Sequence, residues 1–599
     1  MAIDSTSTIL NYSLYAGVSS DFTGFRFPSA FISPAHASGP SLEMYYILLA
    51  MKRWLTIIFL SILSLLFIYP SAFIYPKDTL PDTNDTRLIA YIIGQVQNNI
   101  LEHKPLHFGT FFAPDKNTLA YSDLFLTSAI VTLPARFFTD HPIVIFNLTL
   151  TLNFILTIIS SYLLFSYFFK DHWITTLTVI LFNFSGFHLS YLPHLQIFSL
   201  WPLCLSVYFA TRYLQENRSI YLPLFFLTVT AQIAESIFPV YLIFFTCTIL
   251  AIGHMSKRYL KNVTGVAEVL VKKFTIYSLL FIPLWIFLLL PYYQLHTSLP
   301  EATRPIRDAA HFSLGLDQIF TFYHSGTIIL IFFTSLFISK ILGSAGELVK
   351  KQNAAEVPAK SRAERIRTGN PGTEVEHSFL RSSKRFVFDI WWIVFFFSFI
   401  MSLGPVLKIF GQNLRIFGFP IPLPYTLFYY LFPGFTGFRT PSRFIVLALL
   451  SAVVIIGFQL KPFFGKLKTK TKLILILLVL SLLFVEADLP LKSYPVNINM
   501  HPVYQEVTRL PIDAVILELP IKLWNMPDHE IESVRSLYTL FHKHRRFGGF
   551  SGFATNRWIQ MVQEINAYGL TLQIVEALSS FGVTHIIQNN TLSDLKSDI

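Results

Sequence analysis

Long apolar runs alternate with short polar segments along most of the chain, from residue 54 to residue 488. Because a membrane-spanning helix needs about 20 predominantly apolar residues, this pattern predicts about eleven spans. They lie near 54–75, 143–169, 173–192, 196–213, 219–235, 237–254, 273–292, 327–344, 387–405, 441–460 and 473–488. Pro134 and Arg136 interrupt a further apolar stretch at 124–138, which is expected to be re-entrant or interfacial.

Composition supports an integral membrane protein. The 599 residues are 53% hydrophobic and only 14% charged, whereas soluble domains carry about 25% charged residues. The formal net charge is +11, but Lys and Arg cluster between apolar runs, as in cytoplasmic loops. A lipid bilayer is therefore the expected partner, and nucleic acid is not. Cys204 and Cys247 both lie inside apolar runs and imply no disulfide framework.

The basic clusters also predict a topology. With alternating crossings they all fall on one side, which the positive-inside rule makes the cytoplasmic side. The clusters are Lys52 with Arg53, Lys170, Arg212 with Arg218, residues 257–273, the loop 345–385 and residues 461–472. We therefore expect a multi-pass protein of the cell membrane. Its N-terminus is cytoplasmic, and residues 76–142 and the C-terminal region are extracytoplasmic.

The expected fold is mainly α, with a small C-terminal α/β domain. Residues 1–50 are rich in Ser, Gly, Pro and Phe, and we interpret them as a non-native or disordered extension ahead of a true start at Met51 or Met44. Residues 51–487 then form the transmembrane domain, with a flexible cytoplasmic linker at 345–385. From 488 to 599, strand-like runs alternate with helical stretches, which predicts an extracytoplasmic α/β domain.

A polar stretch from Asp82 to Asp123 follows the first span and holds the two candidate catalytic residues, Asp85 and Asp123. A carboxylate at the membrane edge can act as general base for an acceptor hydroxyl or help to hold a divalent cation. Alternatively, Asn84 or Asp85 is the N-cap of an amphipathic helix at 86–101. Asp123 supplies a second carboxylate or caps the segment 124–138, and capping is the favoured interpretation of Asp123 alone.

Candidate substrate-binding residues lie at the predicted extracytoplasmic ends of spans, where ionisable groups are costly and usually functional. Guanidinium groups match phosphate oxygens in a bidentate way, and the alternative is snorkelling to lipid headgroups. An interfacial imidazole can contact a phosphate or a metal, although a lone histidine there is more often simply hydrogen-bonded. The candidates are Arg87, His194, Gln196, Arg304, Arg307, Arg439 and Arg443. Glu235 is expected to be a solvated residue at a hairpin tip.

Motifs for soluble nucleotides are missing. The sequence has no Walker A motif, no Gly-rich dinucleotide loop, no HExxH and no CxxC. An enzyme driven by a cytosolic nucleotide is therefore disfavoured, and the donor or cargo is expected to come from the membrane.

Several short stretches, taken in order, resemble the GT-C class of integral-membrane glycosyltransferases, in particular its poorly characterised bacterial members. They are residues 85–91 (DTRLIAY), 118–123 (TLAYSD, where such proteins often end in Glu), 194–196 (HLQ), 433–444 (PGFTGFRTPSRF), 517–520 (LELP), His542 and 549–553 (GFSGF). No single stretch is specific, and the resemblance rests on their order and predicted topology over residues 51–590.

The resemblance implies a sugar transferred from a polyprenyl-phosphate donor to a glycan, lipid or protein acceptor of the cell envelope. Asp85 would be the catalytic base or a carboxylate facing a divalent cation, Arg439 and Arg443 would bind the donor phosphate, and the role of Asp123 is less defined. Because fold does not fix the reaction, two alternatives stay open. One is a transporter or flippase of lipid-linked saccharides, and the other is a structural or assembly membrane protein.

Overall fold

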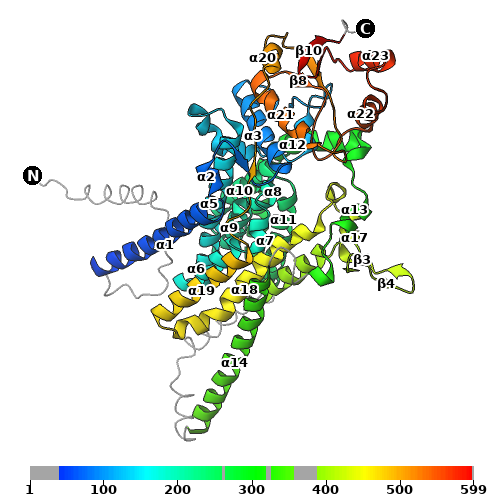
Figure 1. Ribbon diagram of the computed structural model, residues 1–599. Helices are drawn as coiled ribbons and strands as arrows, with labels where there is room; N and C mark the ends of the chain where they lie inside the picture. Colours follow the sequence, from blue (N-terminus) through cyan, green and yellow to red (C-terminus); the bar gives the residue numbers. More distant parts are fainter. Residues whose placement is uncertain (1–39, 260–263, 319–324, 357–387, 596–599) are drawn as a thin grey trace, which may run out of the picture. The chain divides into compact units, whose positions relative to one another are not determined.

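The computed structural model describes residues 40–259, 264–318, 325–356 and 388–595, and these residues are mainly helical (Figure 1). Within these ranges, six helices are long and apolar enough to cross a membrane. They are the 50–67 part of α1 (Pro40–Phe67), α5 (Pro142–Phe169), α8 with α9 (Leu195–Phe198, Trp201–Glu216), α11 (Phe238–Tyr259), α12 (Thr264–Ser298) and η6 with α18 (Pro441–Phe444, Ile445–Lys466). The prediction of a helical membrane protein is confirmed.

Eleven spans are not confirmed, because several predicted spans are shorter helices in the structure. The run at 173–192 divides into α6 (His172–Asn183) and α7 (Gly186–Ser190). The hydroxyl of Ser185 accepts the backbone N–H of His188 and so begins a new helix at this point. The other short apolar helices are α10 (Tyr221–Glu235), the Gly326–Ile341 part of α14 (Gly326–Glu356) and Phe388–Ser402. Helix α19 (Thr469–Glu486) has 18 residues but carries Lys470, Lys472 and Glu486.

The stretch at 124–138 folds as α4 (Leu126–Thr132) and η2 (Leu133–Phe137). At about 1.5 Å per residue, these helices are too short to cross a hydrocarbon core of about 30 Å. Part of the predicted linker is helical, because α14 continues to Glu356, and residues 357–385 lie outside the described ranges. The predicted extension is described only from residue 40, where α1 begins.

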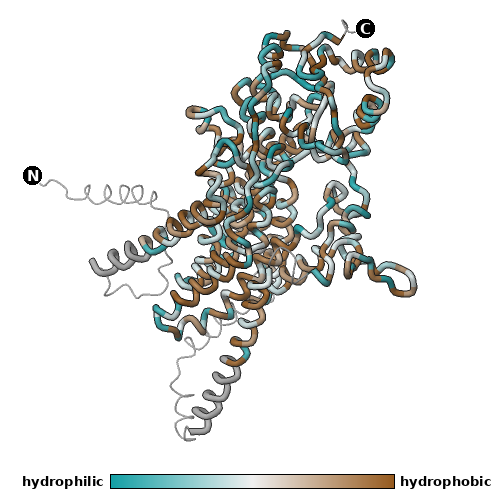
Figure 2. The backbone as a smooth tube through the Cα atoms, in the orientation of Figure 1, coloured by the Kyte–Doolittle hydropathy of each residue, from teal (hydrophilic) through white to brown (hydrophobic). Residues whose placement is uncertain are grey.

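Burial separates central helices from peripheral ones. Helix α18 packs against α14, α6 and α5, and nearly all its apolar side chains are buried. Helix α12 leaves most of its apolar side chains exposed. A helix that is apolar on all sides is stable only in a protein core or in lipid, so α12 has the surface of a lipid-facing helix. Figure 2 shows the long helices as largely hydrophobic and the C-terminal region as mixed.

The C-terminal region is a small α/β fold, as predicted. Its elements are α20 (Val503–Val507), β7 (Val515–Glu518), α21 (Glu530–His542), β8 (Arg545–Arg546), α22 (Asn556–Tyr568), α23 (Leu572–Ser580), β9 (His585–Gln588) and β10 (Thr591–Asp594). The strand order is β10-β9-β7-β8, with β7 parallel to β8 and β9. All four residues of β7 are buried, as expected for a central parallel strand.

The C-terminal region is joined closely to the first polar loop, and residues 57–599 form one unit. Strand β1 (Thr79–Leu80) pairs with β6 (Tyr494–Pro495), and α21 packs on α3 (Asp85–Leu101). Residues 110–113 exchange backbone hydrogen bonds with Arg546 and Gly548. These contacts hold α3 and the loop that follows it against the α/β fold.

Candidate functional site

Asp85 is the first residue of α3, but it does not cap that helix. The formal N-cap, Asn84, makes no capping hydrogen bond through its side chain. Instead, Oδ1 of Asp82 accepts the backbone N–H groups of Asn84 and Thr86 at 3.1 and 2.9 Å. Asn84 thus occupies the predicted N-cap position, but the side-chain hydrogen bonds at this helix start come from Asp82, and Asp85 is left to interact elsewhere.

The carboxylate of Asp85 faces His194, which lies in the turn before α8. Oδ2 of Asp85 is 3.1 Å from Nδ1 of His194, and the two side chains are 45% and 34% exposed. Burial raises the pKa of Asp85, but His194 and the positive charges of Arg443 and Arg439 outweigh it and bring the pKa below its usual value. Asp85 is therefore an ionised carboxylate at neutral pH, within reach of solvent and beside cationic groups.

Arg439 and Arg443 follow a loop that two helices and the segment before α13 (Ile306–His311) position. Tyr241 of α11 donates a hydrogen bond to the carbonyl of Pro433, at 2.8 Å. His296 of α12 lies 3.1 Å from the hydroxyl of Thr436, and the backbone N–H of Arg304 donates to the carbonyl of Thr436. The loop thus carries its arginines at the junction of α11, α12 and the start of α18.

The two arginines have different surroundings. The guanidinium of Arg439 is exposed and lies over the ring of Phe312, 5.4 Å from its centroid. Arg443 is half-buried, and within the described residues its Nε is a buried atom without a hydrogen-bond partner. The same holds for Oε1 of Gln196, two residues after His194. Both atoms are therefore available to hydrogen-bond a ligand or a water molecule.

Asp123 and Glu235 link the start of α4 to the segment between α10 and α11. Oδ1 of Asp123, which precedes α4, accepts the N–H of Ile237 at 3.1 Å, directly before α11. Glu235, which precedes α11, accepts the N–H and hydroxyl of Ser128 in α4. Glu235 is buried, so its prediction as a solvated tip residue is wrong, because its partners come from a segment distant in sequence. Asp123 therefore contacts the residue before α11, and the N-cap position of α4 is Phe125, which has no side-chain capping bond.

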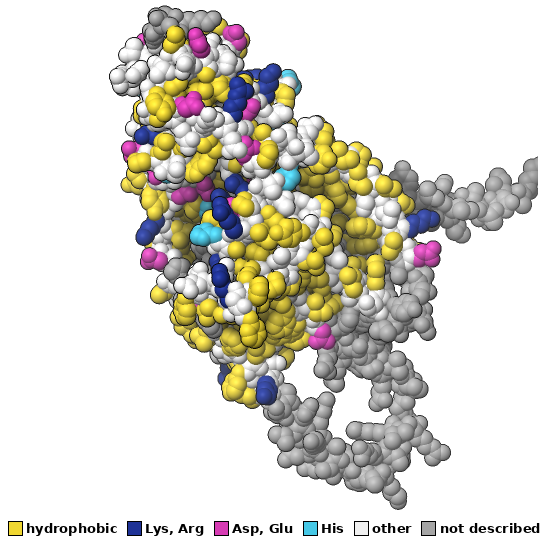
Figure 3. Space-filling view, turned by 90° about the vertical axis from the view of Figure 1, so that its right-hand side faces the viewer, with side chains coloured by type: hydrophobic (Ala, Val, Ile, Leu, Met, Phe, Trp, Pro, Cys, Tyr) yellow, Lys and Arg dark blue, Asp and Glu magenta, His cyan; other side chains and the backbone are white. Residues whose placement is uncertain are grey.

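The charge of Arg443 also acts on Asp123. Burial raises the pKa of Asp123, although Ser236, the Ile237 N–H and the charge of Arg443 oppose the rise. Arg443 therefore acts on both candidate carboxylates, Asp85 and Asp123. Figure 3 shows basic, acidic and histidine side chains grouped within an otherwise largely hydrophobic face.

Arg304 and Arg307 have separate environments near α13 (Ile306–His311). Arg304 donates a hydrogen bond to the carbonyl of Gly552, and its guanidinium lies 6.0 Å from the ring centroid of Phe553. Burial and the nearby charge of Arg439 lower the pKa of Arg304. Arg307 is exposed. Arg304 is therefore close enough to Arg439 to sense its charge, and it also contacts the 549–553 loop of the C-terminal region.

Arg87 is directed toward the C-terminal region and away from Asp85. It is buried, and its guanidinium lies 3.6 Å from the carboxylate of Glu530 in α21. The hydroxyl of Thr83 donates to the same carboxylate at 2.9 Å. Nothing in the sequence identified Glu530 as the partner, since the two residues come from opposite ends of the chain. This contact anchors α21 to the start of α3.

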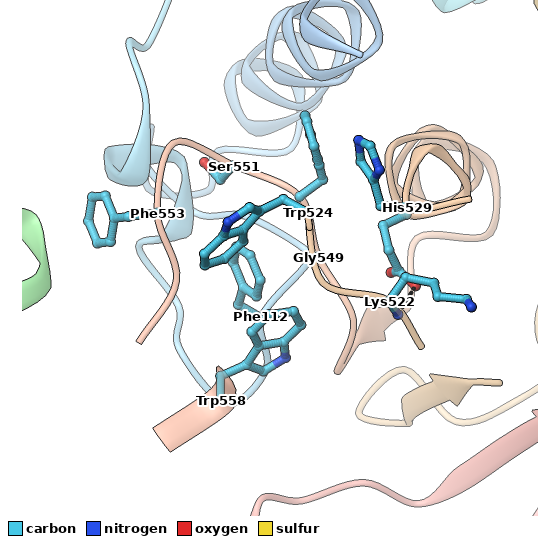
Figure 4. Close-up of a pocket in the computed structure, with 10 residues that line it drawn as sticks. Phe112, Lys522, Trp524, His529, Gly549, Ser551, Phe553 and Trp558 are labelled. Carbon is cyan, nitrogen blue, oxygen red and sulfur yellow. Dashed lines mark hydrogen bonds between the residues drawn. The ribbon is translucent and has the colours of Figure 1, made fainter. Parts of the chain in front are cut away.

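A narrow pocket of about 10 Å³, with room for about one water molecule, opens beside the 549–553 loop. Its walls include the rings of Phe112, Trp524, Phe553 and Trp558 (Figure 4). Its polar groups include Lys522, His529 and Ser551. Tyr121, two residues before Asp123, stacks on Phe553 with the centroids 4.6 Å apart. The pocket wall therefore touches both the first loop and, through Phe553, Arg304.

In the part of the chain that the structure describes, no three or more His, Cys, Asp or Glu side chains gather so that they could hold a metal ion. Asp85 and His194 contribute two neighbouring groups of the kinds that bind metals. The chain matches no protein-family model, and no curated protein is significantly similar to it in sequence.

Proposed function

We propose that this chain is a membrane glycosyltransferase that moves a sugar from a polyprenyl-phosphate donor to an acceptor hydroxyl on the extracytoplasmic side. The observation that carries the proposal is the ionised carboxylate of Asp85, 3.1 Å from His194 and within the field of Arg439 and Arg443. The apolar helices support a donor that arrives through the bilayer.

In the proposed step, the acceptor oxygen attacks the anomeric carbon of the donor sugar. The bond between that carbon and the phosphate oxygen breaks, and polyprenyl phosphate leaves with the bonding electron pair. The acceptor proton passes to Asp85. Because the pKa of Asp85 is below its usual value, its carboxylate is a weak base, and the proton moves only when the new bond is largely formed. His194 orients the carboxylate.

The leaving phosphate needs positive charge, and we assign this role to Arg439 and Arg443. A guanidinium offers paired N–H donors to phosphate oxygens. Nε of Arg443 has no hydrogen-bond partner among the described residues, so this donor is available to a phosphate oxygen. Arg439 is fixed over Phe312 while it stays exposed. A divalent cation at Asp85 remains a prediction from sequence.

The acceptor is assigned to the C-terminal region. The residues around the narrow pocket beside 549–553 combine aromatic rings with a few polar groups, which offer stacking and hydrogen bonds to an acceptor. Arg304 contacts Gly552 and Phe553 of this loop and lies within the electrostatic influence of Arg439. Asp123 is assigned a positioning role, since its carboxylate accepts a backbone N–H at the start of α11.

The test is sugar transfer by purified protein in lipid vesicles that contain polyprenyl-phosphate sugars. Wild type is compared with Asp85→Asn, which keeps the size of the side chain and removes its charge. Loss of a general base lowers kcat by about 10²–10⁴-fold. Transfer by Asp85→Asn at the wild-type rate, or no transfer by wild type with any donor, would overturn the proposal. Movement of donor across the bilayer without transfer would identify a flippase.

A further inference from the structure

Two consecutive β-hairpins at residues 408–420 carry apolar tips that the fold leaves uncovered. The first pairs β2 (Lys408–Ile409) with β3 (Gln412–Asn413), and the second pairs β4 (Arg415–Ile416) with β5 (Phe419–Pro420). Each turns through a Phe-Gly pair, at 410–411 and 417–418. In Figure 1, β4 lies on an arm that projects from the neighbouring helices.

The tip residues are unusual for water-exposed turns. Phe410, Phe417 and Phe419 are 80%, 96% and 76% exposed. Phe410 and Phe417 also have positive φ angles of 50° and 51°. Two-residue hairpin turns with positive φ favour Asn, Asp or Gly at this position, and a bulky side chain there is strained. Neither turn geometry nor internal packing therefore explains the two phenylalanines.

The surroundings of the hairpins point to the bilayer as the missing contact. The segment lies in the chain between the helix that ends at Ser402 and the span that begins at Pro441, so it emerges where apolar helices end. Its exposed charged residue is Arg415, and no Asp or Glu occurs from 408 to 420. The following helix, α17 (Pro424–Leu431), exposes Leu427, Tyr430 and Leu431. Aromatic and basic residues are typical of membrane interfaces.

We infer that the tips of the two hairpins, at Phe410 and Phe417, insert into the interfacial layer of the lipid bilayer. The base of the first hairpin is fixed to the segment around α13. The N–H of Phe410 donates to Asp317 at 2.7 Å, and Nζ of the buried Lys408 donates to the carbonyl of His311 at 2.8 Å. Phe312, the next residue, lies under Arg439. Inserted tips would therefore hold Arg439 at the level of lipid phosphates.

The experiment places an environment-sensitive NBD fluorophore at position 417 through Phe417→Cys. The background replaces Cys204 and Cys247 with Ala. The matched control is Gln505→Cys, an exposed position on α20. Full-length protein is reconstituted in vesicles of phosphatidylcholine and phosphatidylglycerol, with and without doxyl-labelled phosphatidylcholine. We expect NBD emission at 417 to shift to shorter wavelength and to be quenched by doxyl lipid, with no quenching at 505.

Quenching at 417 by aqueous iodide and not by doxyl lipid would overturn the inference. A shift to shorter wavelength without doxyl quenching would also overturn it, because the tip would then be covered by protein. This assay does not depend on the proposed function. A second arm, which rests on that function, compares transfer by wild type and Phe417→Asp. If doxyl lipid quenches NBD at 417 but wild type and Phe417→Asp transfer sugar at equal rates, the tip inserts into the bilayer and insertion is not needed for the reaction.

Discussion

The carboxylate of Asp82 accepts the N–H of Thr86 at 2.9 Å and its hydroxyl at 2.6 Å. This pair performs the capping work at the start of α3 and leaves Asp85 free to face His194. Two carboxylates three residues apart thus have different roles, one in folding and the other in the proposed chemistry. The two roles can be told apart by experiment. Loss of a helix cap lowers stability, whereas loss of the proposed base lowers the rate of sugar transfer.

We expect Asp82→Ala to lower the free energy of unfolding by about 1 kcal/mol, the usual cost of a lost N-cap. Asp85→Asn should leave the thermal midpoint close to that of wild type and lower kcat for sugar transfer by about 10²–10⁴-fold. Thermal unfolding in detergent and transfer in vesicles measure the two effects. If Asp85→Asn were as destabilising as Asp82→Ala, Asp85 would have a structural role that the hydrogen bonds at the start of α3 do not show.

Arg443→Ala and Arg439→Ala should weaken donor binding more than acceptor binding. Each charge-assisted hydrogen bond to phosphate contributes on the order of 1.5–3 kcal/mol, so KM for the lipid-phosphate donor should rise about tenfold or more. Arg509→Ala, an exposed arginine on the C-terminal region, is the control. Steady-state kinetics with the donor and the acceptor varied separately provide the measurement. Unchanged donor KM in both variants would assign these arginines to lipid headgroups.

The sequence predicted the apolar helices better than the contacts at their ends. Residues 143–169 were predicted as a span and 142–169 form α5, because a long apolar run has few alternatives in lipid. The break at Ser185 was missed, since one hydroxyl inside an apolar run gives no periodic signal. The hydrogen bonds at helix ends depend on which polar side chains come together after folding, and the order of residues along the chain does not reveal this.

Most of the candidate site was predicted by residue type and not by partner. Asp85, His194, Arg439 and Arg443 were selected as ionisable groups near span ends, and the structure brings their charges together. Asp85 and His194 lie on separate elements, so no local pattern could pair them. For the same reason Glu235 was misplaced, because its buried partner, Ser128, belongs to another segment.

Glu235→Ala should destabilise the protein without direct effect on the chemistry. It would leave the buried N–H and hydroxyl of Ser128 without their acceptors, and an unsatisfied buried polar group costs about 1–3 kcal/mol. Asp123→Asn keeps an oxygen that can accept the Ile237 N–H, so its stability and turnover should both stay near wild type. Thermal midpoints and transfer rates are the measurements. Loss of turnover in a stable Asp123→Asn protein would move Asp123 from a positioning to a catalytic role.

A buried ionic network should dominate the stability of the C-terminal region. Arg546 donates to Glu518 at 2.5 Å and to Glu532 at 2.6 Å, and all three side chains are almost fully buried. Removal of one partner from such a pair typically costs about 3–5 kcal/mol. Glu518→Gln in the full chain should therefore lower the unfolding midpoint strongly, whereas Glu506→Gln, on the exposed side of α20, should not. Equal midpoints for the two variants would contradict this assignment.

Acid should destabilise the C-terminal region before it protonates most carboxylates. Burial lowers the pKa of His542 to about 4, although the charge of Glu518 opposes the shift and His544 and Arg546 add to it. The folded state therefore binds fewer protons at this site than the unfolded state, whose histidine titrates near 6.5. The contribution of His542 to the free energy of unfolding is fully present above pH 6.5 and is lost as the pH drops toward 4, by on the order of 3 kcal/mol.

Unfolding midpoints of full-length wild type between pH 7.5 and 4.5 should fall more than those of His542→Gln. His501→Gln, at an exposed position, should follow wild type. A pH dependence in His542→Gln as steep as that of wild type would show that other groups control acid sensitivity.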